Sequence, residues 1–385
     1  MKGKPMSMLM EKPVFSIIIP VYNAEKYIRK SIESVIKQGF GDWQLLLIDD
    51  CSTDQSLVIC REYEKKDDRI KVLPLKSNQG ASQARNKGIE AADGVYITFM
   101  DSDDYIETNV LTNVYYVLEL HPAKLTVIGA IEEYYDSKGV LTDEIEIMPI
   151  GSQDEKAIEY AAAGNHTDSM KVLFLKEQQS LRRHIIELEK STLYGYLWNK
   201  YYDADYLKQT GLKMETLPLL EDAKFNILYS MDIDTMNLIN IAAYHYCKRA
   251  EDSLTSKYVK DYFKIHRDHI NMLFSQQITW GNTDSRTRGV LADIYGRYII
   301  SALLRNCDKR AGMSYKDRKA WLKSVLKDNL FNELIPYGNG NGTLNRTLML
   351  VLRSKITWLG LAAGRVIYII KSKFPKLFAA ARKKH

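Results

Sequence analysis

Three carboxylates stand within four residues at Asp101-Ser102-Asp103-Asp104, directly after an apolar run. Their mutual repulsion is unfavourable unless a cation or solvent offsets it. Hard divalent cations such as Mg²⁺ and Mn²⁺ take oxygen ligands, often one or two carboxylates together with substrate phosphates. The cluster therefore predicts a divalent-metal site, and a solvated turn of helix-capping aspartates is the alternative.

Over residues 14–105, apolar runs typical of buried strands alternate with segments of helical periodicity. These strands and helices would position the cluster. The predicted strands are Val14–Ile19, Trp43–Ile48, Ile70–Leu73 and Val95–Met100, and the predicted helices begin near Ile28, Ser52 and Gly80. Ser52 and Gln55 have the spacing of a capping box that opens the second helix. Four such units predict a doubly wound α/β sheet with ligands at the carboxyl ends of its strands, where Asp49–Asp50 and Asp101–Asp104 both lie.

The rest of the chain is less regular. A strand is predicted at Leu125–Ile128, and residues 152–190 are polar and helix-rich. Residues 258–333 have helical spacing of Tyr, Leu and Ile. Pro336 and the run Gly338–Gly342 predict a flexible break before the C-terminal tail.

The composition is that of an ordinary globular protein. The chain has 385 residues, 45% hydrophobic and 26% charged, which excludes collagen-like, low-complexity and largely disordered classes. The four cysteines have no CxxC spacing, so neither a zinc ribbon nor a disulfide framework is predicted, and a reducing, intracellular context is expected. Residues 1–12 lack the apolar stretch of a secretory signal and are predicted to be a disordered start.

The net charge of +6 is unevenly distributed. Residues 334–385 hold ten Lys and Arg and no Asp or Glu, which leaves −4 for residues 1–333. This pattern excludes a globally basic nucleic-acid binder.

The tail combines these cations with an apolar stretch, Ile356–Ile370, that only Arg365 interrupts. The stretch is shorter than the roughly 20 apolar residues that span a bilayer. Cations suit the negative surface of a cytoplasmic leaflet, and aromatic residues such as Trp358 and Tyr368 are enriched at membrane interfaces. We expect the tail to attach to an anionic membrane surface, and a helix packed on the body or at an oligomer interface is the alternative.

Four motifs of the N-terminal half resemble those of the family 2 glycosyltransferases with the GT-A fold, in the family's order and at its usual separations. They are Ser16–Asn23, Ile48–Asp54, Asn78–Gly80 with Ala84–Asn86, and Tyr96–Asp104. The strong match covers about a quarter of the chain, and a weaker one continues to about Thr255. The bacterial members that the chain resembles build cell-surface polysaccharides.

The resemblance implies a GT-A fold, which is a Rossmann-like, doubly wound mixed sheet, followed by a helical C-terminal region and a basic tail. The expected catalytic domain spans residues 13–256, with a nucleotide-binding half at 13–105 and an acceptor half at 106–256. A helical region at 257–335, a linker at 336–345 and the tail at 346–385 are expected to follow.

The resemblance also assigns donor-binding residues. Pro20, Val21 and Tyr22 would cradle the nucleoside, and Asp50 would accept a hydrogen bond from its base. The other residues implied on the nucleotide side are Asn78, Gly80, Arg85, Asp101 and Ser102. Asp101-Ser102-Asp103 matches the DxD motif, so Asp103 would bind Mn²⁺ or Mg²⁺ and Asp101 would contact ribose or water. The metal would neutralise the diphosphate leaving group.

The downstream acidic pair Glu221-Asp222 resembles the family's catalytic segment. Asp222 would be the base that takes the proton of the acceptor hydroxyl, and the like charge of Glu221 favours a raised carboxyl pKa. Without the resemblance, the pair would be interpreted as an acidic helix start. Trp198 would form a sugar-stacking wall for the acceptor, with a core tryptophan as the alternative.

A last segment, Tyr244–Arg249, resembles one that closes over the diphosphate. Only Arg249 is predicted as a phosphate contact, because Cys247 stands where the family often has arginine. His245 is predicted to be a packed histidine rather than a metal ligand.

The implied function is inverting, metal-dependent transfer of a sugar from a UDP-linked donor to a glycan acceptor in capsule, exopolysaccharide, O-antigen or teichoic-acid assembly. The implied acceptor is lipid-linked or membrane-proximal, the expected location is the inner face of the cell membrane, and a homo-oligomer is possible. A nucleotidyltransferase is an alternative, although the chain lacks a Gly-rich, Lys/Arg-bearing loop after its first strand. A non-catalytic nucleotide-sugar-binding scaffold is another, against which the intact Asp101, Asp103 and Asp222 count.

Overall fold

The computed structural model describes residues 12–151, 154, 156–163, 169–249, 259, 261–340 and 342–373. Residues 1–11 of the predicted disordered start and residues 374–385 of the predicted tail lie outside this range. The chain divides into two compact units, residues 1–253 and 254–385.

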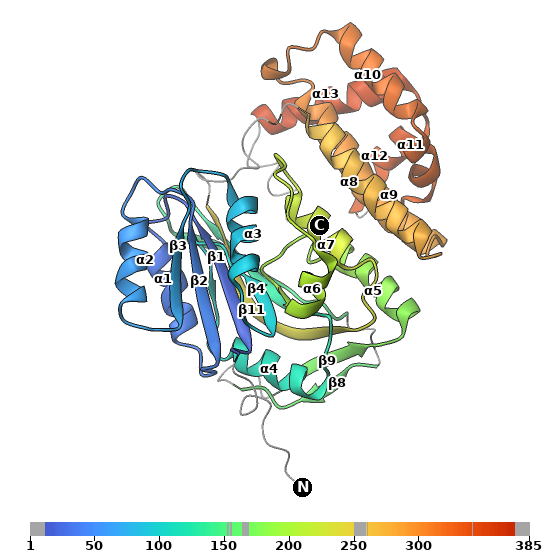
Figure 1. Ribbon diagram of the computed structural model, residues 1–385. Helices are drawn as coiled ribbons and strands as arrows, with labels where there is room; N and C mark the ends of the chain where they lie inside the picture. The colour runs from blue at the N-terminus through green and yellow to red at the C-terminus, as the bar shows by residue number, and fades with distance from the viewer. Residues whose placement is uncertain are drawn as a thin grey trace. The chain divides into compact units, whose positions relative to one another are not determined.

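The N-terminal unit is built on one mixed sheet with the strand order β3-β2-β1-β4-β10-β6-β11-β9-β8 (Figure 1). Its parallel part consists of β1 (Phe15–Val21), β2 (Trp43–Asp49), β3 (Ile70–Pro74) and β4 (Tyr96–Phe99). The order reverses direction at β1, as in doubly wound sheets, so the carboxyl ends of β1, β2 and β4 open to a ligand together. The predicted alternation of strands and helices over residues 14–105 and the α/β fold class are confirmed.

The remaining strands extend the sheet. They are β5 (Tyr105–Ile106), β6 (Leu125–Tyr135), β7 (Leu141–Ile147), β8 (Ile158–Tyr160), β9 (Met170–Leu175), β10 (Lys200–Asp203) and β11 (Met236–Arg249). β10 lies antiparallel between β4 and β6, and β11 runs parallel to β6. The short strand β5, just after the acidic cluster, pairs with β11 and so holds the end of the cluster beside that strand.

The helices of this unit follow the strands closely. They are α1 (Ile28–Ile36), α2 (Ser56–Glu64), α3 (Ala81–Ala91), α4 (Val110–Leu120), α5 (Gln178–Lys190), α6 (Ala204–Thr210) and α7 (Glu221–Tyr229). Figure 1 shows α1 and α2 on one face of the parallel strands and α3 on the other. Strand residues such as Ile17 and Leu46 are buried because both faces are covered.

Two local predictions in this unit are wrong. α2 begins at Ser56 without a side-chain cap, because the Ser52 hydroxyl accepts a hydrogen bond from the Asn23 amide of another loop at 3.2 Å instead of capping the helix. Among the described residues of the segment 152–190 the helix is α5, whereas β8 and β9 add strands to the sheet.

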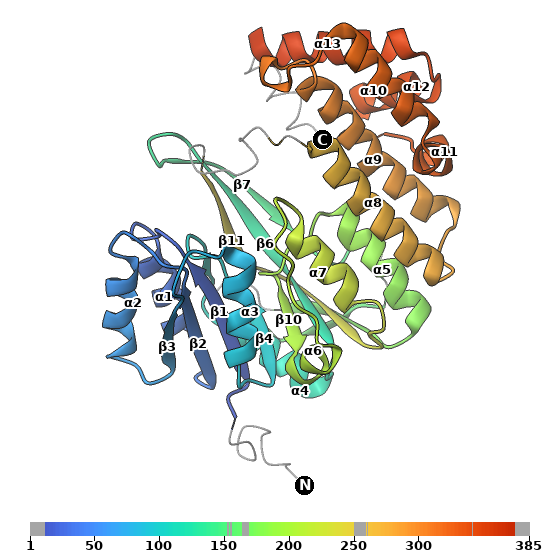
Figure 2. The ribbon, with the colours of Figure 1, turned by 45° about the horizontal axis from the view of Figure 1, so that its top comes forward.

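The C-terminal unit is helical, as predicted (Figure 2). It consists of α8 (Tyr262–Thr279), α9 (Ser285–Arg305), α10 (Tyr315–Lys327), α11 (Asn329–Leu334), α12 (Gly342–Arg353) and α13 (Thr357–Lys373). α9 is central and packs against α8, α11, α12 and α13. None of the described helices is both long and apolar enough to cross a bilayer.

The predicted flexible break before α12 is an ordered turn over its described residues, 336–340. The Gly340 amide donates to Asp293 of α9 at 2.8 Å. A Cβ at Gly338 would lie 2.3 Å from the Met349 side chain and 3.0 Å from Ala292, so glycine lets the turn pack closely against α9. Glycine is used here for close approach rather than for flexibility.

Candidate active site

The loops after β1 and β2 hold each other through side-chain to backbone hydrogen bonds. Asn23 Oδ1 accepts from the Thr53 amide at 2.8 Å, and the Ser56 hydroxyl accepts from the Ala24 amide at 2.7 Å. Glu25 completes the set, because its amide donates to Asp54 at 3.1 Å and its carboxylate accepts from the Gln55 amide at 3.0 Å. The two loops therefore form one surface at the carboxyl edge of the sheet.

The three predicted nucleoside residues differ in exposure. Tyr22 is 50% exposed on this surface, and Pro20 is half-buried. Val21 is fully buried, and its carbonyl accepts from the Asp50 amide at 2.8 Å. Val21 thus positions Asp50, and its side chain is not available to a ligand in this conformation.

Asp50 lies buried behind the loop that begins α3. Its two oxygens accept the backbone amides of Gln79 at 2.7 Å and Gly80 at 2.8 Å. Gly80 has a φ of 86°, a left-handed conformation that glycine adopts without strain, and Asn78 before it is exposed. Asp50 therefore fixes the loop that carries Asn78 and Gly80 beside the β1–β2 surface.

The acidic cluster forms a turn after β4, in which the fourth residue is structural. Asp104 is buried and accepts from the Tyr244 hydroxyl at 2.9 Å and the Cys247 amide at 2.8 Å. Burial raises the pKa of Asp104 well above its usual range, and the charges of Asp103 and Asp101 raise it further. The Ser31 hydroxyl donates to the carbonyls of Asp104 and Ser102 at 2.6 and 3.0 Å, which fixes the turn from α1.

Asp101 and Asp103 remain accessible, with 32% and 41% of their side-chain surface exposed. Each is paired with an arginine: Arg85 with Asp101 at 2.8 Å, and Arg249 with Asp103 at 2.9 Å. Arg249 also donates to the Asp103 carbonyl at 3.0 Å and lies 4.0 Å from the Tyr27 ring centroid. Arg85 of α3 and Arg249 of β11 thus offset the negative charge of the cluster. The local sequence around the cluster does not indicate these two partners.

Arg85 joins the acidic cluster to the downstream acidic pair. Its guanidinium donates to Asp101 Oδ1 at 2.8 Å and to Asp222 Oδ1 at 2.9 Å, although Asp101 lies in the turn after β4 and Asp222 on α7. Burial acts to lower the pKa of Arg85, but the charges of Asp222 and Asp101 outweigh it and hold the guanidinium protonated. The buried Arg85 guanidinium therefore fixes the distance between Asp101, in the predicted nucleotide-binding half, and Asp222, in the predicted acceptor half.

Asp222 lies in the first turn of α7, just after Leu220, whose φ is 65°. Burial raises the pKa of Asp222 to about 7; Arg85 opposes this rise, and Glu221 and Asp101 add to it. A carboxyl with a pKa near 7 suits proton transfer at neutral pH. The raised pKa expected from Glu221 is thus present, but desolvation is its largest cause.

The donor set at the turn fits a divalent cation. Among the described residues no group of three or more His, Cys, Asp or Glu side chains could hold a metal. Mg²⁺ and Mn²⁺ at nucleotide sites commonly need only one or two carboxylates, because substrate phosphates and water complete the shell. Asp101 and Asp103 supply that number of hard oxygen donors.

His245 is a packed histidine, as predicted. Its ring nitrogens lie 2.8 Å from Glu133 and 2.8 Å from Glu107, and the ring stacks on Tyr105. Both nitrogens lie within hydrogen-bond distance of a carboxylate, so neither is turned toward the acidic cluster as a metal ligand.

Trp198 belongs to the core rather than to an exposed sugar-stacking wall, which corrects the sequence prediction. It is 4% exposed and stacks on Tyr196 at 4.4 Å and on Tyr244 at 4.3 Å between ring centroids. Two stacked neighbours leave no free ring face for a sugar. Tyr196 and Tyr246 at the rim of this stack are only half-buried.

Two residues that the sequence did not single out hold the loop before Trp198. Lys200, fully buried, donates to the carbonyls of Leu193 and Tyr196 and to Asn199. Asn226, one helical turn after Asp222 on α7, donates to the carbonyls of residues 194, 195 and 196 at 3.0 to 3.1 Å. Burial lowers the pKa of Lys200 well below its usual value, opposed by the charges of Asp222 and Glu189.

Replacing Asn226 by alanine should lower the free energy of unfolding by about 3 kcal/mol. The substitution leaves three carbonyls and the Tyr202 hydroxyl, which donates to Asn226 at 2.6 Å, without this partner in a buried site. Urea titration followed by circular dichroism measures the loss. Asn78→Ala, at an exposed position, is the control and should change stability by less than about 0.5 kcal/mol.

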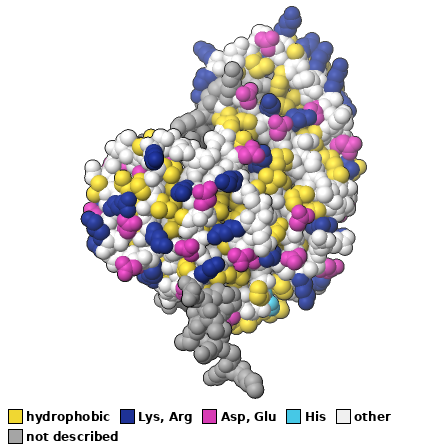
Figure 3. All heavy atoms as spheres, in the orientation of Figure 1, with side chains coloured by type: hydrophobic (Ala, Val, Ile, Leu, Met, Phe, Trp, Pro, Cys, Tyr) yellow, Lys and Arg dark blue, Asp and Glu magenta, His cyan; other side chains and the backbone are white. Residues whose placement is uncertain are grey.

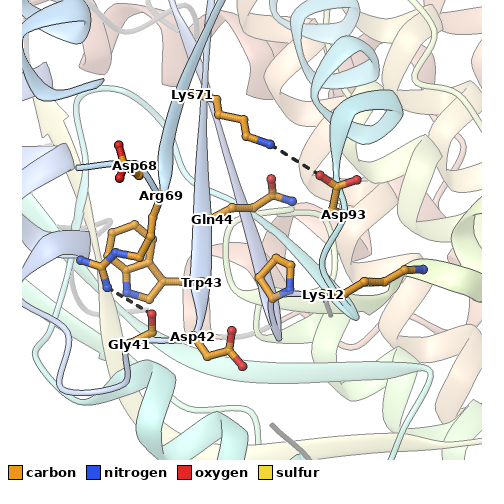
Figure 4. A pocket seen from close by; sticks show the side chains of 10 residues that line it. Lys12, Gly41, Asp42, Trp43, Gln44, Asp68, Arg69, Lys71 and Asp93 are labelled. Carbon is orange, nitrogen blue, oxygen red and sulfur yellow. Dashed lines mark hydrogen bonds and ion pairs between the residues drawn. The ribbon is translucent and has the colours of Figure 1, made fainter. Parts of the chain in front are cut away.

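A depression of the N-terminal unit lies away from these residues (Figure 4). It has a volume of about 730 Å³ and is lined by Trp43, Arg69 and Lys71, which stand at the starting ends of their strands. Arg69 donates to the Gly41 carbonyl at 3.1 Å, and Lys71 lies 3.7 Å from Asp93. The depression is at the sheet edge opposite Asp50 and Asp101 and takes no part in the site.

Comparisons with known proteins identify the family. The profile of glycosyl transferase family 2 matches residues 16–182. An uncharacterized glycosyltransferase of Haemophilus influenzae is 32% identical over 251 residues, which cover 57% of this chain and 96% of that protein. The chain belongs to glycosyl transferase family 2.

Two further similarities are more limited. TuaG of Bacillus subtilis, whose name assigns it provisionally to teichuronic acid biosynthesis, is 48% identical over 93 residues. This match covers 24% of the chain and spans only 37% of TuaG. Residues 1–349 of S. aureus TarS, solved with UDP-GlcNAc, share the fold with a TM-score of 0.59 at 21% identity, covering 91% and 90% of the two chains.

Proposed function

We propose that the chain is an inverting, metal-dependent glycosyltransferase that moves a sugar from a UDP-linked donor to a glycan acceptor of a bacterial cell-surface polysaccharide. The observation that carries the proposal is the bridge of Arg85 between Asp101 and Asp222. Arg85 holds the Asp222 carboxyl, whose pKa is raised to about 7, at a fixed distance from Asp101. Asp101 and the accessible Asp103 lie at the carboxyl edge of the sheet, where doubly wound folds bind nucleotides.

In this proposal Asp222 takes the proton of the acceptor hydroxyl as its oxygen attacks the anomeric carbon of the donor sugar. The bond from that carbon to the diphosphate oxygen breaks on the opposite side, so the configuration inverts and the nucleoside diphosphate leaves. Arg85 keeps Asp222 oriented, and partial burial keeps its pKa near the working pH.

Asp101 and Asp103 would hold Mn²⁺ or Mg²⁺ beside the diphosphate. When bound, the cation supplies Lewis-acid stabilisation of the leaving group. Arg249, which pairs with Asp103 at 2.9 Å, would lie close enough to contact a phosphate oxygen of the donor. Tyr22 and the loop at Asn78–Gly80, which Asp50 positions, would receive the nucleoside.

The relatives support the substrate classes of this proposal. TuaG is named for teichuronic acid biosynthesis, and TarS was solved with UDP-GlcNAc. A screen of the common nucleotide sugars with purified protein and Mn²⁺ tests the donor, because slow hydrolysis without acceptor releases the nucleotide. Release of UDP from one UDP-sugar is expected. Release of pyrophosphate from a nucleoside triphosphate and a sugar phosphate would instead indicate a nucleotidyltransferase.

Replacing Asp103 by asparagine should reduce transfer at least about 100-fold, because a cation held there stabilises the developing charge of the leaving group. Donor affinity measured by calorimetry should then no longer depend on Mn²⁺. Asp68→Asn, at an exposed position away from the site, is the matched control and should keep both properties. Full activity of the unmodified protein in excess chelator would contradict the proposal.

A further inference from the structure

We propose that the C-terminal unit docks on an anionic lipid surface through the outer face of α13 and the neighbouring basic face of α10. The first observation is an apolar stripe on α13. Trp358, Val366 and Ile369 are 66%, 55% and 38% exposed, and the exposed Ala362 lies between them. Their spacing of four, four and three residues places all four on one side of the helix.

The opposite side of α13 is anchored, so the stripe cannot turn inward. Gly360, Gly364 and Ile367 are its buried residues. A Cβ at Gly364 would lie 2.9 Å from the Leu303 side chain of α9, and one at Gly360 would lie 2.9 Å from Leu322 of α10. Glycine thus brings α13 into close contact with both helices and fixes which face points outward.

Exposed cations accompany the stripe. Arg365 and Lys373 fall within the same sector of α13. α10 packs beside α13 and carries a row of exposed lysines, one helical turn apart: Lys316, Lys319, Lys323 and Lys327. Dark blue side chains project from the rim of this unit in Figure 3.

The charge of the whole unit supports an anionic partner. Residues 254–385 contain 25 Lys and Arg against eight Asp and Glu, a net charge of +17. Residues 1–253 contain 29 against 40, a net charge of −11. The positive excess is therefore larger than that of the tail alone and includes α10.

The combination favours lipid over other anionic or apolar partners. A soluble polyanion would use the cations but leave Trp358 and Val366 in water, where an exposed apolar stripe has no benefit. A second copy of the unit would cover the stripe but bring two strongly positive surfaces together. A bilayer interface offers an apolar layer next to anionic headgroups, and an amphipathic helix that lies in it buries such a stripe.

The test uses the full chain and sucrose-loaded vesicles of phosphatidylcholine, with or without 30% phosphatidylglycerol. Sedimentation with the anionic vesicles is expected at low salt and should weaken as salt rises, because the Debye length falls from about 10 Å at 0.1 M to about 3 Å at 1 M. Neutral vesicles should bind far less protein.

Two variants separate the two parts of the surface. Val366→Asp should lower vesicle partitioning about tenfold by placing a charge in the stripe. The double variant Lys319→Gln/Lys323→Gln should lower vesicle partitioning by up to about fivefold for each lysine removed. Val58→Asp is the control, because Val58 is 52% exposed on α2 of the other unit, and it should change nothing.

Three results would overturn the proposal. Equal binding to neutral vesicles would remove the role of charge. Unchanged vesicle binding by Val366→Asp, together with heparin binding, would identify a soluble polyanion as the partner. A dimer in sedimentation velocity that Val366→Asp dissociates, without vesicle binding, would identify a self-association surface. Thermal melts and donor hydrolysis of all variants should match the unmodified protein, so a failure here is distinguishable from a failure of the proposed enzymatic function.

Discussion

Asp222→Asn should reduce glycosyl transfer by roughly 10²- to 10⁴-fold, the usual contribution of a general base, while donor affinity stays nearly unchanged. The asparagine keeps the size of the side chain and can still accept a hydrogen bond from Arg85, which retains Asp101 as its ionic partner. Donor binding depends on the nucleotide-side residues, whereas the base acts on the acceptor. Rate measurements and calorimetric titration with the donor separate the two effects.

The pH dependence provides an independent readout of the same group. A carboxyl with a pKa of about 7 is protonated below that pH and cannot accept a proton, so the transfer rate should fall tenfold per pH unit on the acid side. A cation on Asp101 removes one of the negative charges that raise this pKa, so the midpoint should lie at or below about 7. Glu221→Gln is the matched control and should keep most activity and shift the midpoint to lower pH. If donor affinity and rate fall together in Asp222→Asn, the residue is not simply the base.

Arg85→Met should destabilise the fold by about 3 to 5 kcal/mol and abolish transfer. Breaking a buried ion network by removing one partner leaves the other charges uncompensated, and Arg85 is 6% exposed between two carboxylates. Because Arg85 lowers the pKa of Asp222, its loss should also raise that pKa and favour the protonated, inactive base. Urea denaturation measures the loss of stability.

A surface ion pair gives the matched comparison for Arg85. Arg29 pairs with Glu62 at 3.0 Å, with about half of each side chain exposed. Arg29→Met should cost less than about 1 kcal/mol, since exposed pairs contribute little. Equal effects of the two substitutions would mean that Arg85 does not have the bridging role that the structure shows.

The strands around the site were predictable because parallel strands covered on both faces are short apolar runs, such as Trp43–Ile48 and Val95–Met100. The local sequence does not determine which group a side chain bonds to. Ser52 and Gln55 have capping-box spacing, yet the Ser52 hydroxyl bonds to another loop, a choice that only the tertiary fold determines. The glycine-rich run that begins at Gly338 predicts a flexible break, but Gly338 packs closely against Met349 and Ala292.

The same distinction holds within the site. The acidic residues were identified because their motifs are local and ordered along the chain. The contacts of Arg85 with Asp222 and of Arg249 with Asp103 join residues more than 130 positions apart, and no local pattern indicates them. Lys200 and Asn226 were missed for the same reason, since their acceptors are backbone carbonyls that any sequence would provide.

The mutual hydrogen bonding of the loops after β1 and β2 has a consequence for local opening. The amides of Ala24, Glu25, Thr53 and Gln55 each donate to a side chain on the other loop. Neither loop can leave the surface without breaking the bonds of its partner, so the two behave as one cooperative unit. In hydrogen–deuterium exchange these four amides should therefore share a single opening event, and a nucleotide that binds this surface should slow all of them by the same factor, including those it does not touch.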